Sequence, residues 1–138
     1  MCKKLKMEIV ICGSMTLARK MLEIERELIN QGHNVILPAF TEEYSEEEIH
    51  NESAKNKIKH DLIRNYFEKI KQGDAVLIVN ERRNGIDNYI GGNSFLEMGF
   101  AHILNKAIYL LNPIPQMTYR DEIIAMQPII LNNNLLNV

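Results

Sequence analysis

The chain has 138 residues, of which 46% are hydrophobic and 25% charged. This composition suits one globular domain whose core needs neither disulfides nor metals to hold it. The net charge of −2 offers no basic field for nucleic acid or an anionic membrane. The apolar run behind the basic N-terminus covers only residues 9–12, too short for a signal peptide or a membrane span, so we expect a cytoplasmic protein.

Periodicity predicts strands and helices that alternate along the whole chain. The expected strands are short, β-branched or uniformly apolar runs, and the expected helices carry apolar residues at helical spacing. In chain order they are a strand at 7–12, a helix from 17 to a glycine cap at 32, a strand at 34–37, a helix at 53–72, a strand at 75–79, a helix ending near 105, a strand at 107–111, a short helix at 120–126 and a last run at 129–131.

The segment 41–52 interrupts this series. It is rich in glutamate and has no apolar period, so we expect a solvated loop or lid. An acidic, flexible face explains Glu42 to His50 better than a metal site does. Cys2 and Cys12 have neither a metal-binding spacing nor a disulfide framework, and we expect Cys12 to be a small buried hydrophobe.

Strands that alternate with helices imply right-handed crossovers and a parallel sheet with helices on both faces. We therefore predict a single α/β domain over 1–138, with a flavodoxin-like, doubly wound, five-stranded parallel sheet in the order 2-1-3-4-5. In such sheets the ligand binds beyond the carboxyl ends of the strands. The loops expected to meet there are 13–16, 80–92 and 112–116.

Glu97 is the most informative candidate for chemistry. The segment 95–104 is apolar on nearly all sides, so a carboxylate in its first turn is costly unless something binds it. One interpretation is a partly desolvated nucleophile or base. The other is a capping box, in which Ser94 and Glu97 satisfy backbone N–H groups. The local pattern fits both.

Two glycine-containing turns are weaker candidates. Gly91 and Gly92, between Tyr89 and Asn93, expose backbone N–H groups before a helix, where an anion or a sugar hydroxyl can bind. The turn at 13–14 lacks the lysine of a P-loop and the full dinucleotide-binding fingerprint. Neither a mononucleotide kinase nor a dinucleotide dehydrogenase is supported.

The remaining polar candidates have plainer explanations. Asp74 opens the third strand, at the end of the sheet away from the expected site, and is typical of a turn. His60 and Asp61 are expected on the solvated face of a helix. Tyr66 and Tyr89 are amphipathic rings that suit a pocket wall, although Tyr66 also has the spacing of a core residue.

Three stretches together resemble the nucleoside 2-deoxyribosyltransferase superfamily, which includes the 2′-deoxynucleoside 5′-phosphate N-hydrolases. They are Cys12-Gly13-Ser14 after the first strand, Gly73-Asp74-Ala75-Val76-Leu77 at the third, and Ser94-Phe95-Leu96-Glu97-Met98-Gly99-Phe100-Ala101 followed by Asn105-Lys106. The likeness runs in order over most of 7–111. The glutamate-aliphatic-glycine-aromatic-alanine block is its most specific part.

The resemblance implies that Glu97 attacks C1′ of a deoxyribose and that water or a second base resolves the glycosyl-enzyme. It implies no metal or organic cofactor, a nucleoside or nucleotide as ligand, and a homodimer or larger homo-oligomer. The substrate-binding residues expected from these motifs and loops are Gly13, Ser14, Tyr66, Asn80, Tyr89, Gly91, Gly92, Asn93 and Ser94.

The chain also departs from the family pattern. Tyr66 stands where relatives place a base-contacting aspartate, and Asp61 is an uncertain substitute. Met15 stands near the place of an aromatic residue that binds the nucleophile, and Gly91 replaces a phosphate-binding serine. Two hypotheses follow. The chain is an N-glycosidase or transferase, with a slight preference for hydrolysis because the 12–14 turn is more similar to that of the hydrolases, or it is a non-catalytic nucleotide-binding or regulatory module.

Overall fold

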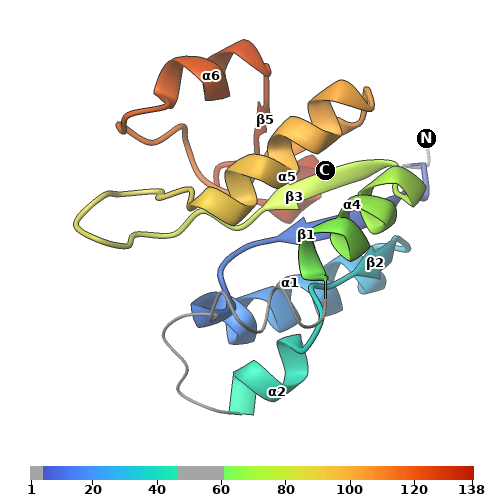
Figure 1. Ribbon diagram of the computed structural model, residues 1–138. Coiled ribbons are helices and arrows are strands. Elements are labelled where there is room, and N and C mark those ends of the chain that lie inside the picture. The colour runs from blue at the N-terminus through green and yellow to red at the C-terminus, as the bar shows by residue number, and fades with distance from the viewer. Residues whose placement is uncertain (1–4, 47–60) are drawn as a thin grey trace.

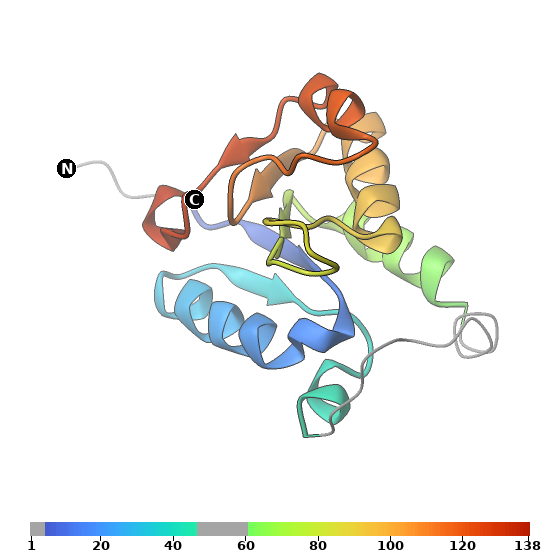
Figure 2. The same ribbon diagram turned by 90° about the vertical axis from the view of Figure 1, so that its left-hand side faces the viewer.

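The computed structural model describes residues 5–46 and 61–138, whose strands form one parallel sheet between two layers of helices (Figures 1 and 2). The strands are β1 (Glu8–Cys12), β2 (Asn34–Ile36), β3 (Ala75–Ile78), β4 (Ala107–Leu110) and β5 (Ile129–Ile130). The helices are η1 (Met15–Leu17), α1 (Ala18–Asn30), α2 (Thr41–Glu46), α4 (Leu62–Gln72), α5 (Gly92–Ile103), α6 (Arg120–Ala125) and η2 (Leu135–Asn137).

The strand order is β2-β1-β3-β4-β5 and every pair is parallel. This confirms the predicted doubly wound, flavodoxin-like α/β architecture. The order reverses at β1, so the loops after β1 and β3 leave the sheet on either side of a natural crevice. In Figure 1 these loops and the start of α5 all lie at the left-hand end of the sheet.

Alternate residues of the strands build two cores, one on each face of the sheet. Ile9, Ile11 and Leu77 belong to the core beneath α1. Val10 and Cys12 belong to the opposite core, with side chains of α4, α5 and α6. Figure 2 shows α1 below the sheet and these three helices on its other side. Cys12, at the last position of β1, therefore faces α4 and α5.

The segment 41–52, which was expected to be a loop, is helical in the part that the structure describes. The prediction of a loop or lid was wrong for 41–46, which form α2; residues 47–52 lie outside the described part of the chain. The Thr41 N–H and hydroxyl both donate to the Pro38 carbonyl oxygen, and Glu42 and Glu43 in the first turn suit the positive end of a helix.

The helix predicted at 53–72 is present as α4 from Leu62 onward, and 53–60 lie outside the described residues. It does not continue unbroken through Asp61, because that residue has a left-handed backbone with φ 47°. Such a conformation cannot extend a right-handed helix. Asp61 is exposed, as predicted, and pairs with Arg64 at 3.5 Å.

Candidate active site

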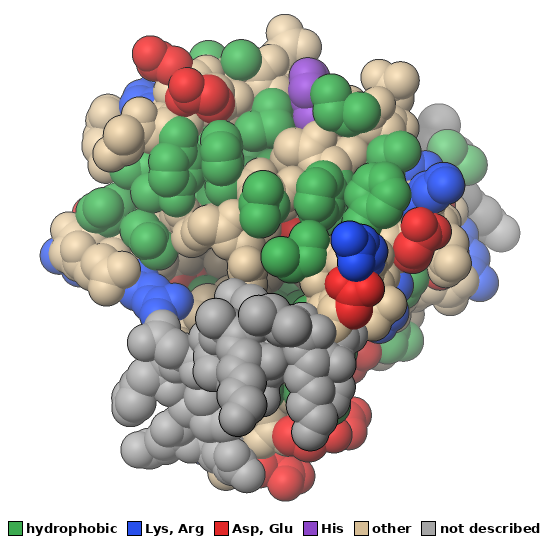
Figure 3. Space-filling view, in the orientation of Figure 1, with side chains coloured by type: hydrophobic (Ala, Val, Ile, Leu, Met, Phe, Trp, Pro, Cys, Tyr) green, Lys and Arg blue, Asp and Glu red, His purple; other side chains and the backbone are tan. Residues whose placement is uncertain are grey.

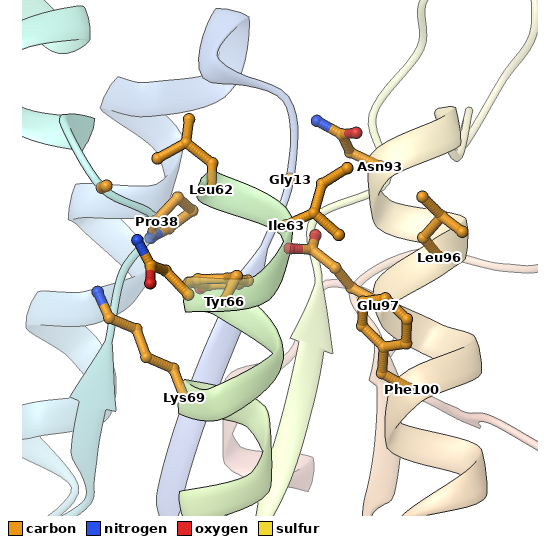
Figure 4. Close-up of a pocket in the computed structure, with 12 residues that line it drawn as sticks. Gly13, Pro38, Leu62, Ile63, Tyr66, Lys69, Asn93, Leu96, Glu97 and Phe100 are labelled. Atoms are coloured by element: carbon orange, nitrogen blue, oxygen red, sulfur yellow. The ribbon is translucent and has the colours of Figure 1, made fainter. Parts of the chain in front are cut away.

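A cavity of about 270 Å³ lies between α4 and α5 at the carboxyl end of β1 (Figure 4). It is lined by Gly13, Pro38, Ala39, Leu62, Ile63, Asn65, Tyr66, Lys69, Asn93, Leu96, Glu97 and Phe100. Most of these side chains are apolar, so the walls suit a flat ring or the face of a sugar. Glu97 is the one carboxylate among the described residues that line this cavity.

Glu97 lies in the second turn of α5 rather than the first, because the helix begins at Gly92 with Gly91 as its N-cap. The capping-box interpretation was therefore wrong: Ser94 is buried inside the first turn and is not the cap. Glu97 is half-buried, and its carboxylate points across the cavity toward α4 (Figure 4). A carboxylate held in this way faces a ligand-sized space.

Tyr66 forms the wall of the cavity opposite Glu97. It is only 6% exposed, and its hydroxyl donates a hydrogen bond to the Ile11 carbonyl oxygen. Burial raises the pKa of Tyr66 well above its ordinary value, and electrostatic coupling to Cys12 and Glu97 raises it further. The phenol therefore stays protonated, with its proton directed at the backbone of β1 and its ring presented to the cavity.

Cys12 lies behind the cavity and is completely buried. Its pKa is raised well above the ordinary value, mainly by burial, then by the charge of Glu97 and a hydrogen bond to the Glu97 side chain. The thiol therefore stays protonated beside the carboxylate and is not a thiolate nucleophile.

A second, larger and more open groove of about 1020 Å³ adjoins the cavity, with Asn93 and Leu96 lining both. Arg82 and Arg83 line this groove, as do the glycines at the start of α5. Arg83 Nη1 donates to Ser14 Oγ at 2.8 Å. The groove therefore combines cationic side chains with a helix N-terminus, an arrangement that favours anions.

The expected substrate-binding residues divide between these two spaces. Gly13, Tyr66 and Asn93 line the cavity together with Glu97. The groove is lined by Ser14, Tyr89, Gly91, Gly92, Asn93 and Ser94. The structure thus brings nearly the whole expected set to one edge of the sheet.

Asn80 is the exception, since it lines neither space. It is fully buried, and its Nδ2 donates to the carbonyl oxygens of Asn112 and Pro113 at 2.9 and 3.2 Å. Its Oδ1 accepts from the Asn112 N–H at 2.9 Å. Asn80 therefore fastens the loop after β3 to the loop after β4.

Several lining residues were missed from the sequence. Asn65 and Lys69 sit on α4 beside Tyr66, and Arg82 and Arg83 sit in the loop after β3. The loop 80–92 was expected at the site, so its two arginines were the available signal for an anion. Asn65 and Lys69 gave no signal because each looks like an ordinary solvated position on an amphipathic helix.

Asp74 has the structural role that its position suggested. Its Oδ2 accepts a hydrogen bond from the Glu8 N–H at 2.8 Å and so fastens the start of β1 to the start of β3. This lies at the end of the sheet away from the cavity.

Residues 5–46 and 61–138 contain neither a candidate metal-binding cluster nor a candidate membrane-spanning helix. In that part of the chain, no three His, Cys, Asp or Glu side chains gather as a group that could hold a metal ion. None of the helices described there combines the length and apolar character needed to cross a bilayer.

Comparison with known proteins gives a likeness in structure but not in sequence. No protein-family model and no curated protein matches the sequence. Among solved structures, the chain is similar to a 2-deoxyribosyltransferase from the psychrotolerant bacterium Bacillus psychrosaccharolyticus, with 24% identity over 75% of this chain and 70% of that chain, and a TM-score of 0.47. A likeness at this level assigns neither a family nor an activity.

Proposed function

We propose that the protein cleaves the N-glycosidic bond of a (deoxy)nucleoside or a nucleoside 5′-monophosphate through a covalent glycosyl-enzyme on Glu97. The observation that carries this proposal is one half-buried carboxylate facing a cavity of about 270 Å³ with largely apolar walls. The sequence motif around Glu97, which resembles that of nucleoside deoxyribosyltransferases, supports the same role.

The shape and chemistry of the cavity support a nucleoside as substrate. Pro38 and Leu62 lie on one side of the Tyr66 ring, and Phe100 lies beside Glu97 (Figure 4). Flat apolar surfaces favour a base, while Asn65 and Asn93 offer amide groups for its edge or for sugar hydroxyls.

In the proposed first step, a Glu97 carboxylate oxygen forms a bond to C1′ as the bond from C1′ to the base nitrogen breaks. The electron pair leaves with the base, which takes a proton from water. In the second step, water attacks C1′, loses a proton and releases the glutamate; in base transfer, the nitrogen of a second base takes the place of water. Because C1′ is attacked twice, the sugar keeps its configuration.

The groove next to the cavity supports a substrate that carries a 5′-phosphate. A sugar whose C1′ meets Glu97 can direct its 5′ group toward the residues shared by cavity and groove, Asn93 and Leu96. Beyond them, the N–H groups at the start of α5 and the Arg83 guanidinium suit a phosphate.

The second candidate function is a nucleotide-binding or regulatory module without turnover. The observation that favours it is the absence of a second carboxylate among the described residues of the cavity. Retaining glycosidases commonly use such a group to protonate the leaving group. The Tyr66 proton, donated to the Ile11 carbonyl oxygen, is directed away from the cavity.

We also propose that the protein acts as a homo-oligomer. Figure 3 shows apolar side chains gathered over α4, α5 and α6. Ile63, Leu96 and Ile103 on this face are 47%, 46% and 80% exposed. Exposed apolar patches of this kind mark association surfaces. Ile63 and Leu96 also line the cavity, so a second copy on this face would border the site.

The direct test of the proposed reaction is incubation with a panel of nucleosides, deoxynucleosides and their 5′-monophosphates, with free base followed by chromatography. We expect release of base from at least one deoxynucleoside 5′-monophosphate. Release from no member of the panel, together with a rise in melting temperature on adding nucleotides, would support the binding module instead.

A further inference from the structure

The buried thiol next to Glu97 has no part in the mechanism above. Cys12 is the last residue of β1 and is completely buried in the core that also holds Tyr66 and Met98. Its neighbour in the chain, Gly13, lines the cavity. Cys12 therefore lies immediately behind the site, on the face of the sheet that α4 and α5 cover.

Cys12 lies close enough to Glu97 to interact with it: the charge of Glu97 and a hydrogen bond with its side chain both raise the pKa of the thiol, after the larger effect of burial. The thiol also donates to the Val10 carbonyl oxygen, 3.9 Å from the sulfur, which is long even for a thiol donor. Full burial keeps the sulfur from contact with a substrate. Cys12 can therefore act on a substrate only indirectly, through residues such as Glu97 that line the cavity.

We propose that Cys12 is a positioning residue, whose buried S–H holds the Glu97 carboxylate toward the cavity in the orientation needed to attack C1′. This inference rests on the proposed function of Glu97. A thiol suits the task because it is a weak donor: it fixes the carboxylate while withdrawing little negative charge from the attacking oxygen. A protonated thiol also adds no charge of its own.

A hydrogen bond to the ionised form of a carboxyl lowers its pKa, so loss of the thiol must raise the pKa of Glu97. The other titratable groups of the described residues that line the cavity are Tyr66 and Lys69, both on α4. Neither is substituted in the Cys12 variants, and Cys12→Ser keeps a side chain of similar volume against Tyr66, so a change in the titration of Glu97 that appears in Cys12→Ala alone reports on the thiol.

The matched pair for the test is Cys12→Ala, which removes the donor, and Cys12→Ser, which keeps one at similar volume. Each protein is prepared with ¹³C-labelled glutamate carboxyl groups and titrated by NMR, with Glu97→Gln assigning the signal. We expect a higher apparent pKa of Glu97 in Cys12→Ala and recovery in Cys12→Ser. This readout needs no turnover, so it stands even if the panel shows no base release.

Where base release is measurable, we expect kcat to fall about tenfold in Cys12→Ala with KM unchanged, and to recover in Cys12→Ser. An acidic limb of the kcat profile that moves to higher pH in Cys12→Ala would support the same account. The proposal is overturned if both variants titrate and turn over like the wild type. It is also overturned if both variants lose activity to the same extent. That result would indicate that the sulfur itself reacts with the substrate, because a serine hydroxyl can replace a thiol as a hydrogen-bond donor but not as a nucleophile.

Discussion

The cavity at Glu97 and the groove at Arg83 lie side by side, yet they differ in almost every physical respect. The cavity has a volume of about 270 Å³, mostly apolar walls and a single carboxylate among the described residues. The groove has a volume of about 1020 Å³ and is lined by two arginines, a glutamate and the start of α5. The comparison suggests two tasks at one sheet edge, chemistry in the cavity and anion binding in the groove.

A difference in exposure to solvent is the physical reason for the division that we propose. Charges act over a longer range where water is excluded, so one carboxylate in a confined space can direct a reaction. In the open groove, water and salt screen each charge, and several weak contacts are needed to hold one ligand. Arg82, whose side chain is 64% exposed and paired with Asp87, belongs to this screened environment.

The strongest test of the difference between the cavity and the groove is to neutralise one carboxylate in each. We expect Glu97→Gln to lower kcat by about a thousandfold or more, because it removes the proposed nucleophile while keeping the shape of the side chain. Glu81→Gln, in the groove, is the matched control and should leave kcat within a small factor of the wild type. Base release by both variants, measured by chromatography, is the readout; equal losses would remove the distinction between the two spaces.

The apolar face over α4, α5 and α6, which we propose as the association surface, can be tested by introducing charge. Ile103 on α5 is 80% exposed, and Ile29 on α1, beneath the opposite face of the sheet, is 52% exposed. We expect Ile103→Lys to weaken self-association at least about tenfold, since a buried lysine is costly at an apolar interface. Ile29→Lys should have no effect on the mass measured by light scattering. An unchanged mass in both variants would refute this face as the interface.

The role of the groove in anion binding can be tested by comparing KM for substrates with and without a phosphate. Arg83→Gln should raise KM about tenfold for a nucleoside 5′-monophosphate and leave KM for the nucleoside unchanged, because only the phosphate meets the guanidinium. The control is Arg82→Gln, whose charge is already paired with Asp87, and a smaller effect is expected. A parallel loss for both substrates would place Arg83 in the structure of the loop rather than in phosphate binding.

The smallest expected effect concerns the stability of the cavity wall. Tyr66→Phe should lower the free energy of unfolding by about 1 kcal/mol at neutral pH, because the Ile11 carbonyl loses its donor. Since the folded-state pKa of Tyr66 lies well above 10.0, the unfolded chain ionises first, and wild-type stability falls as pH rises past that value. Urea unfolding at neutral pH and above pH 10 should show a shallower fall in Tyr66→Phe. Equal falls would contradict the raised pKa.

The fold could be predicted from sequence because its signals are local and repeated. Uniformly apolar strands such as 75–78 and amphipathic helices such as 18–30 carry their period in a few neighbouring residues. The helix at 41–46 was not predicted because it has no apolar period of its own. It is held by contacts with other parts of the chain: the Thr41 hydroxyl donates to the Pro38 carbonyl oxygen, and Tyr44 packs against the core between the sheet and α1.

The site could be predicted only in outline. Glu97 stood out because it interrupts an apolar helix, but its place in the second turn depends on a helix that starts at Gly92 without a side-chain cap. Asn80 looked like a ligand-binding residue because of its place after β3, yet its amide is used within the fold by Asn112. The interaction between Cys12 and Glu97 joins two elements distant in sequence, and no local pattern indicates it.

The most direct test of the central claim is intact and peptide mass spectrometry after incubation with a 2′-fluoroarabino nucleotide analogue. Its fluorine slows both chemical steps by opposing positive charge at C1′, and the leaving base should depart faster than water can release the sugar. The account predicts one added glycosyl group on the peptide that contains Glu97, and none on the Glu97→Gln variant. A glycosyl group on another residue, or equal labelling of the variant, would contradict it.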